Sequence, residues 1–108
     1  MSHISTHVLD AATGRPAPGM TILLETHAGD VLAKGETDAD GRVSALGPET
    51  LPPGGYRLLF ETGAWFALAE RETFYPRVTI EFEVAADSGH YHVPLLLSPF
   101  AYSTYRGS

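Results

Sequence analysis

Two histidines near the end of the sequence are the first candidates for chemistry. His90 and His92 are two positions apart, so in a strand both side chains lie on the same face. The residues that follow pass from an apolar run into a tail rich in tyrosine, serine and arginine, which indicates a site. Imidazole has an ordinary pKa of about 6.5 and can take and return a proton near neutrality. The pair is therefore a candidate for acid and base chemistry on water, although each histidine alone is also typical of a polar surface or interface.

His7 and Arg42 extend the candidate site. Val8 is the residue expected in the core, so its neighbour His7 faces the opposite way. Arg42 opens a strand directly after the turn residues 38–41. It is either a solvated charge at a strand end or, if the fold brings it to the histidines, a clamp for an anion or a carbonyl.

Several other chemistries have no candidate residues. The sequence has no cysteine, which excludes disulfides, zinc thiolates and thiol nucleophiles. It contains no glycine-rich phosphate loop and no G-x-S-x-G motif for an acyl-enzyme serine. Three histidines could bind zinc, but a pair two positions apart without a nearby carboxylate is a weak ligand signature. We therefore expect a site that uses no metal and no cofactor.

The charge balance argues against large anionic partners. Seven basic and thirteen acidic residues give a net charge of -6, which repels phosphate backbones and anionic membrane surfaces. We expect no nucleic acid and no membrane partner. The segment 1–7 has neither the cationic lead nor the apolar stretch of a secretory signal, so the expected compartment is the cytoplasm.

Short strands must position these residues. The clearest alternation is at 78–84, where Val78, Ile80, Phe82 and Val84 fall on one face and polar residues fall on the other. Similar runs separated by turn residues predict about eight strands in all, the others being 3–10, 20–26, 31–36, 42–46, 56–61, 91–98 and 100–106.

The remaining elements complete an all-β fold. Residues 63–70 are rich in helix formers and precede Pro76, which predicts one short helix between the fifth and sixth strands. The whole pattern predicts a single domain over residues 1–108, a two-sheet sandwich of antiparallel strands. Pro94 cannot donate to a strand ladder, so a local irregularity is expected just after His92.

The seventh predicted strand has one core face and one unusual outer face. Tyr91, Val93, Leu95 and Leu97 form the better core face. The histidines then look outward together with Pro94 and Leu96, which are too apolar to be left in water. This face is expected to be covered by another subunit, which would place the site at an interface.

At this point the motifs resemble a known family, the 5-hydroxyisourate hydrolases, which are the transthyretin-related enzymes of purine breakdown. The resemblance runs nearly end to end and is specific only when its motifs are taken together. They are 5–10 (STHVLD), 13–17 (TGRPA), 37–42 (TDADGR), 72–76 (ETFYP), 90–99 (HYHVPLLLSP) and 105–108 (YRGS).

The resemblance implies a fold, an assembly and a site. The implied fold is a transthyretin-like sandwich of two four-stranded antiparallel sheets with one short helix. The implied assembly is a homotetramer, a dimer of dimers with active sites in the channel between dimers. By the resemblance, the catalytic residues are His7, His92 and Ser108, and the substrate-binding residues are Arg42, Tyr105, Arg106 and Gly107.

The implied reaction is metal-free hydrolysis of 5-hydroxyisourate to 2-oxo-4-hydroxy-4-carboxy-5-ureidoimidazoline in urate catabolism. His7 and His92 would activate water and return its proton, with Ser108 hydrogen-bonded to them. Two other functions stay open: a carrier that binds an aromatic small molecule without turnover, and a purely structural interaction module. The related hormone carrier transthyretin lacks the second histidine and the terminal YRGS motif, so the resemblance favours the enzyme.

Overall fold

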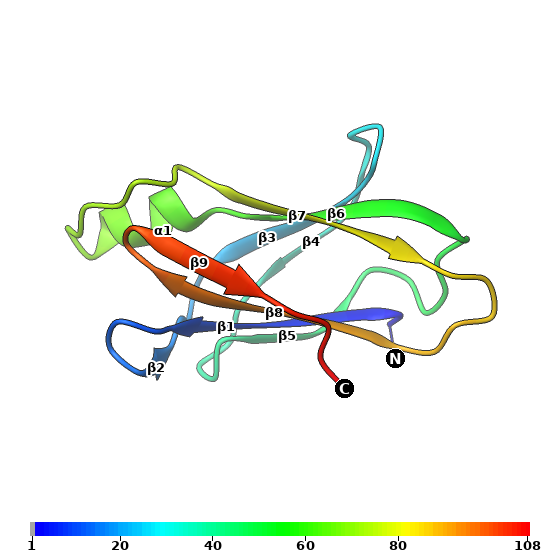
Figure 1. Cartoon of the computed structure of the whole chain (residues 1–108), viewed down its shortest axis with the longest axis horizontal. Coiled ribbons are helices and arrows are strands. Elements are labelled where there is room, and N and C mark those ends of the chain that lie inside the picture. Colours follow the sequence, from blue (N-terminus) through cyan, green and yellow to red (C-terminus); the bar gives the residue numbers. More distant parts are fainter. Residues whose placement is uncertain (1) are drawn as a thin grey trace.

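Two β-sheets pack face to face in the computed structural model, which describes residues 2–108 (Figure 1). Met1 lies outside the described residues. The elements in chain order are β1 (Ile4–Asp10), β2 (Arg15–Pro16), β3 (Thr21–Thr26), β4 (Val31–Glu36), β5 (Arg42–Leu46), β6 (Gly54–Phe60), α1 (Thr62–Leu68), β7 (Val78–Val84), β8 (Tyr91–Ser98) and β9 (Ala101–Thr104). The predicted all-β sandwich with one short helix is confirmed.

The two sheets have different strand orders. One is ordered β4-β3-β6-β7, and every pair in it is antiparallel. In the other, β1 is central, β8 and then β9 follow on one side, and β2 and β5 both pair with the opposite side of β1. This second sheet has five strands, because the return of the turn after Asp10 adds the two-residue β2 to the four expected.

One strand pair corrects the antiparallel prediction. β1 and β8 are parallel over their shared length, from Ile4 opposite Tyr91 to Asp10 opposite Leu97. Antiparallel pairing was expected because short turns join most consecutive strands, but parallel strands need only a long connection. Between β1 and β8 the chain passes through all four strands of the β4-β3-β6-β7 sheet, which supplies that connection.

The core lies between the sheets and follows the predicted alternation. Val78, Ile80 and Val84 of β7 are buried, and Phe82 is partly buried and packs against them. On β8 the residues predicted to face inward are all buried in the same core: Tyr91, Val93, Leu95 and Leu97. The opposite face of β8, with His92, is therefore the outer face of its sheet.

Pro94 acts on the neighbouring strand rather than on β8 itself. β8 pairs with β1 from end to end without a shift in register. On its other side, β8 pairs with β9 only as far as Leu95 opposite Thr104, and one isolated bridge then joins His92 to Gly107. The two pairings share one register, which would place Tyr105 opposite the nitrogen of Pro94, where no N–H exists. The predicted strand 100–106 therefore stops at Thr104.

The single helix begins and ends slightly earlier than predicted. It contributes Phe66 to the core, and the indole N–H of Trp65 donates to the carbonyl of Pro18 at 2.7 Å. It ends at Leu68, and Glu70 adopts a positive φ of 55° that reverses the chain. Among residues 2–108, no helix has the length and apolar character needed to cross a bilayer.

Candidate functional site

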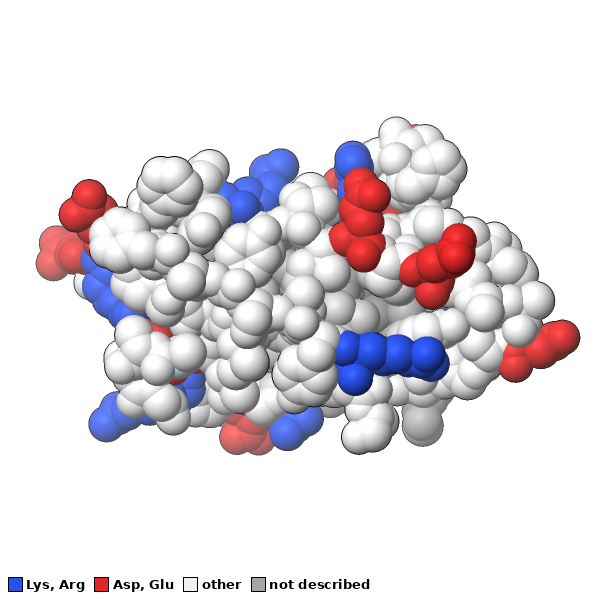
Figure 2. Space-filling model, viewed as in Figure 1, with Lys and Arg blue, Asp and Glu red and all other residues white. Residues whose placement is uncertain are grey.

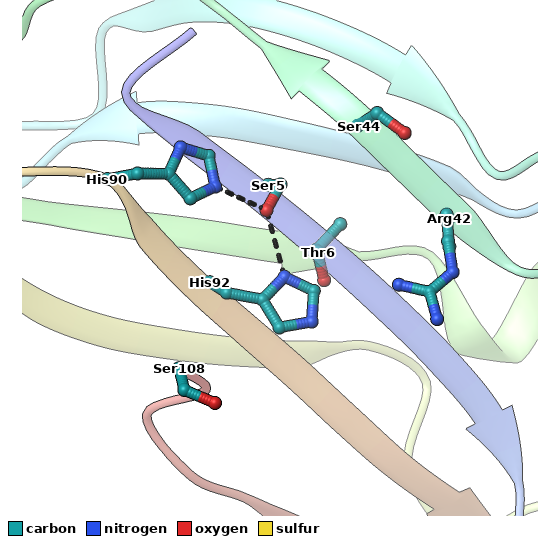
Figure 3. Close-up of a pocket in the computed structure, with 7 residues that line it drawn as sticks. All are labelled: Ser5, Thr6, Arg42, Ser44, His90, His92 and Ser108. Carbon is teal, nitrogen blue, oxygen red and sulfur yellow. Dashed lines mark hydrogen bonds between the residues drawn. The ribbon is translucent and has the colours of Figure 1, made fainter. Parts of the chain in front are cut away.

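A small polar pocket lies on the outer face of the sheet that contains β1, β5 and β8. Its volume is roughly 230 Å³. Residues with hydroxyl, imidazole and guanidinium groups line it, and Figure 3 shows His90, Ser5 and His92 close together with the Arg42 guanidinium on the side of His92. The lining residues are Ser5, Thr6, Arg42, Ser44, His90, His92 and Ser108.

Strand pairing brings these side chains together. Ser5 lies opposite His92 across the β1–β8 pair, and His7 lies opposite Arg42 across the β1–β5 pair. Because paired residues point to the same face of a sheet, residues 5 and 7 of β1 share the outer face with His92 and Arg42. Strands β1, β5 and β8 therefore present four groups on the same surface: the imidazoles of His7 and His92, the guanidinium of Arg42 and the hydroxyl of Ser5.

Ser5 joins the two histidines of the pocket. Its Oγ is 2.6 Å from Nε2 of His90 and 2.8 Å from Nδ1 of His92 (Figure 3). The other ring nitrogen of His90, Nδ1, donates to the carbonyl of Ser2 at 3.0 Å. The histidine pair seen in the sequence is therefore one connected hydrogen-bonded group.

The environment of His92 favours its neutral form. Burial lowers the pKa of His92 below its ordinary value, and electrostatic interactions with Arg42, His7 and His90 lower it further. A neutral imidazole at neutral pH has a lone pair that can accept a proton from water. The predicted role of His92 as an acid–base group fits this environment.

His7 lies beside the pocket rather than in its lining. Its Nε2 donates to the backbone carbonyl of Asp40 at 2.8 Å, in the turn that precedes Arg42. A carbonyl can only accept, so Nε2 of His7 carries a proton. His7 is thus held next to Arg42, near enough to lower the pKa of His92.

The tail returns to the pocket through Gly107 and Ser108. The Gly107 N–H donates to the carbonyl of His92 at 2.8 Å, and Ser108 lines the pocket. A Cβ on Gly107 would lie 2.5 Å from Cδ2 of the His92 ring, which is closer than carbon atoms pack. Only glycine allows the tail to lie flat against this imidazole.

Tyr105 and Arg106 lie elsewhere in the described chain. They line a larger, mostly apolar pocket of roughly 480 Å³ between β7 and the tail. The Arg106 guanidinium stacks over the ring of Tyr91, 4.5 Å from its centroid. Tyr91 belongs to the core face of β8, so the structure brings Arg42, His92 and Ser108 to one pocket and Tyr105 and Arg106 to another.

The structure adds residues that the sequence did not single out as site residues. Ser5, Thr6 and Ser44 line the pocket with the predicted residues. Ser5 precedes His7 by two positions, so it shares the outer face of β1, and that spacing was a signal that could have identified it. Within residues 2–108, no group of three or more His, Asp or Glu side chains is arranged to hold a metal ion.

Comparison with known proteins shows similarity over the whole chain. The model of the HIUase/Transthyretin family matches residues 4–107. The 5-hydroxyisourate hydrolase of Salmonella dublin is 48% identical over 109 residues, covering 97% of this chain and 80% of that protein. The enzyme of the same name from Caulobacter vibrioides is 44% identical, with both chains covered completely.

Solved structures that resemble this chain include a hydrolase and a transthyretin. The Klebsiella pneumoniae 5-hydroxyisourate hydrolase has a TM-score of 0.92 at 46% identity, with both chains covered completely. Transthyretin from Sparus aurata has a TM-score of 0.90 at 32% identity, covering 99% of this chain and 97% of that one. The fold is thus common to a hydrolase and to transthyretin, and identity is higher to the hydrolase.

Proposed function

This chain belongs to the HIUase/transthyretin family, and we propose that it is an enzyme that hydrolyses 5-hydroxyisourate. The observation that carries the proposal is the polar pocket in which His92, held in its neutral form, lies with Arg42 and Ser108. Relatives named 5-hydroxyisourate hydrolase at 44–48% identity over nearly the full chain support the same activity. The proposal treats residues 1–108 as one functional domain.

The proposed reaction is the opening of the six-membered ring by water. The water oxygen attacks the C6 carbonyl, the N1–C6 bond breaks, and the product is 2-oxo-4-hydroxy-4-carboxy-5-ureidoimidazoline. His7 and His92 take the proton from water and return it to the departing nitrogen, with Ser108 hydrogen-bonded to them. No metal or cofactor takes part in the proposed reaction.

Arg42 has the electrostatic role. It stays protonated, and its planar fork of donors suits the substrate oxygens and the charge that develops on the attacked carbonyl oxygen. Two observations support this role: Arg42 lies opposite His7, and its positive charge lowers the pKa of His92, the proposed proton acceptor. Gly107 supports the site by its contact with His92, and Tyr105 and Arg106 are proposed to bind substrate from the neighbouring pocket when subunits associate.

A carrier function is less well supported by the pocket. Carriers of aromatic molecules bury them mainly against apolar and aromatic side chains. The outer-face pocket here is lined by hydroxyl, imidazole and guanidinium groups, and its histidine has a lowered pKa. Such a lining suits a reaction whose transition state develops charge better than it suits binding without turnover.

The proposed assembly is a homotetramer built as a dimer of dimers. β9 is the outermost strand of its sheet, and Tyr102 in it, Phe100 just before it and Phe74 are all exposed. Figure 2 shows an area without charged side chains over β9 on this face of the molecule. Unpaired strand edges and exposed apolar patches are surfaces that a second copy can cover.

Light scattering of the purified protein tests the assembly, since a stable monomer would contradict it.

The proposed compartment is the cytoplasm, and fractionation of cells that express the natural gene tests this location.

A coupled assay tests the activity. Urate oxidase generates 5-hydroxyisourate from urate, and ultraviolet absorbance follows its decay with the wild-type protein and with His92→Ala. Accelerated decay that the variant loses is the expected result. Decay at the spontaneous rate with the wild-type protein would refute the hydrolase proposal.

A further inference from the structure

The hydrogen bonds around Ser5 have directions that can be deduced from one fixed end. The carbonyl of Ser2 can only accept, so Nδ1 of His90 carries a proton where the two atoms are 3.0 Å apart. In a neutral His90, Nε2 then has no proton and accepts the hydroxyl hydrogen of Ser5 across 2.6 Å. The direction of each hydrogen bond therefore determines the direction of the next.

The same reasoning fixes the tautomer of His92. Ser5 has one hydrogen and gives it to His90, so its oxygen accepts from Nδ1 of His92 across 2.8 Å. The proton of neutral His92 therefore sits on Nδ1, and the lone pair sits on Nε2. Figure 3 shows this second nitrogen on the side of the ring that faces Arg42.

Nε2 of His92 is thus the nitrogen left open to the pocket. Among the described residues, the side-chain hydrogen bond of His92 is the one between Nδ1 and Ser5. A tautomer set by the partner of the other ring nitrogen is a common way to orient a catalytic histidine. Ser5 is well placed for this, because it is 92% buried and bonds to both rings.

We propose that Ser5 and His90 are positioning residues that hold His92 with Nδ1 protonated and Nε2 free, making Nε2 the atom that accepts the proton of water. This role deepens the proposed hydrolase function and rests on it. Neither Ser5 nor His90 touches the reacting atoms; both act through His92. The group composed of the Ser2 carbonyl, His90, Ser5 and His92 is called the histidine relay below.

Two single variants and their combination test the relay. Ser5→Ala removes the hydroxyl, and His90→Ala removes the acceptor on an exposed side chain, so neither threatens the core. Each is expected to lower kcat about 10- to 100-fold with KM changed less than about threefold, as expected for groups that orient a catalytic side chain. The double variant should lose no more than the worse single variant, because both act through one tautomer.

A conservative variant and a matched control accompany them. Ser5→Thr retains the hydroxyl and should restore kcat to within about threefold of the wild type. Thr79→Val removes a hydroxyl from an exposed position of β7 in the other sheet and should leave kcat unchanged. Circular dichroism and light scattering of all variants establish that fold and assembly are intact.

The decisive readout is the tautomer itself, which does not depend on turnover. Nitrogen-15 spectra of the histidine rings in the unliganded protein at pH 8 should show Nδ1–H for His92 in the wild type and in Ser5→Thr. Ser5→Ala and His90→Ala should shift His92 toward Nε2–H. Nε2–H in the wild type, or an unchanged tautomer with unchanged kcat in both alanine variants, would overturn the relay. The expected tautomers without accelerated decay of 5-hydroxyisourate would support the relay and refute the proposed function alone.

Discussion

Replacing Gly107 by alanine tests whether the tail sets the position of His92. The added Cβ would lie 2.5 Å from Cδ2 and 3.1 Å from Cγ of the imidazole. Carbon atoms pack at about 3.5–4.0 Å, so the ring or the tail must move by about 1 Å. A displacement of this size at a catalytic group costs about 100-fold in rate, which corresponds to about 2.7 kcal/mol in the activation barrier.

The assay is the coupled decay of 5-hydroxyisourate, with kcat and KM measured separately. Gly89→Ala is the matched control, because a Cβ there meets nothing within 4 Å and the backbone has no positive φ. The thermal midpoint should change little in either variant, since Gly107 belongs to the tail beyond the last strand. Activity of Gly107→Ala within about threefold of the wild type would show that the contact does not position the ring.

Three further outcomes follow from the site and its supports. Arg42→Gln should lower kcat/KM about 10²- to 10³-fold. Burial first and the Arg42 charge second lower the pKa of His92, so this variant should also shift the acid limb of the kcat/KM profile to higher pH; an unshifted limb would contradict the assigned electrostatics. Deleting residues 105–108 should reduce 5-hydroxyisourate decay to background while lowering Tm by no more than about 8 °C, since β9 is retained. Arg71→Ala removes the donor 2.6 Å from buried Asp10 and should cost about 1–3 kcal/mol in urea unfolding. Burial raises the pKa of Asp10, but Arg71 and two backbone N–H groups bring it below its ordinary 3.8, so this stabilisation is present above pH 3.8 and disappears as the pH falls further. A variant–wild-type difference that persists in strong acid would contradict this explanation.

Strand faces could be predicted because they depend only on local alternation. The inward residues of β7 and the outward direction of His92 were both correct, since neighbouring side chains in a strand point to opposite faces. The turn at 38–41 also correctly placed Arg42 at the start of β5. These predictions needed no knowledge of which strand lies beside which.

Strand neighbours could not be predicted in the same way. The alternation in β1 and β8 is compatible with either direction of pairing, and only the fold shows that Ser5 lies opposite His92. The place of Arg106 was also beyond the sequence, because the break in the ladder opposite Pro94 decides how the tail leaves β9. A motif of four consecutive residues is therefore divided between two pockets.

The shared register of β1 and β8 ties correct folding to activity. Since Val93 and His92 alternate on β8, a slip of one residue against β1 would carry the imidazole inside and the valine outside. Strand content would be almost unchanged after such a slip, so circular dichroism would miss it. Turnover would then be the more sensitive measure of misfolding in this chain, because assembling the core in its native alignment and assembling the site are the same event.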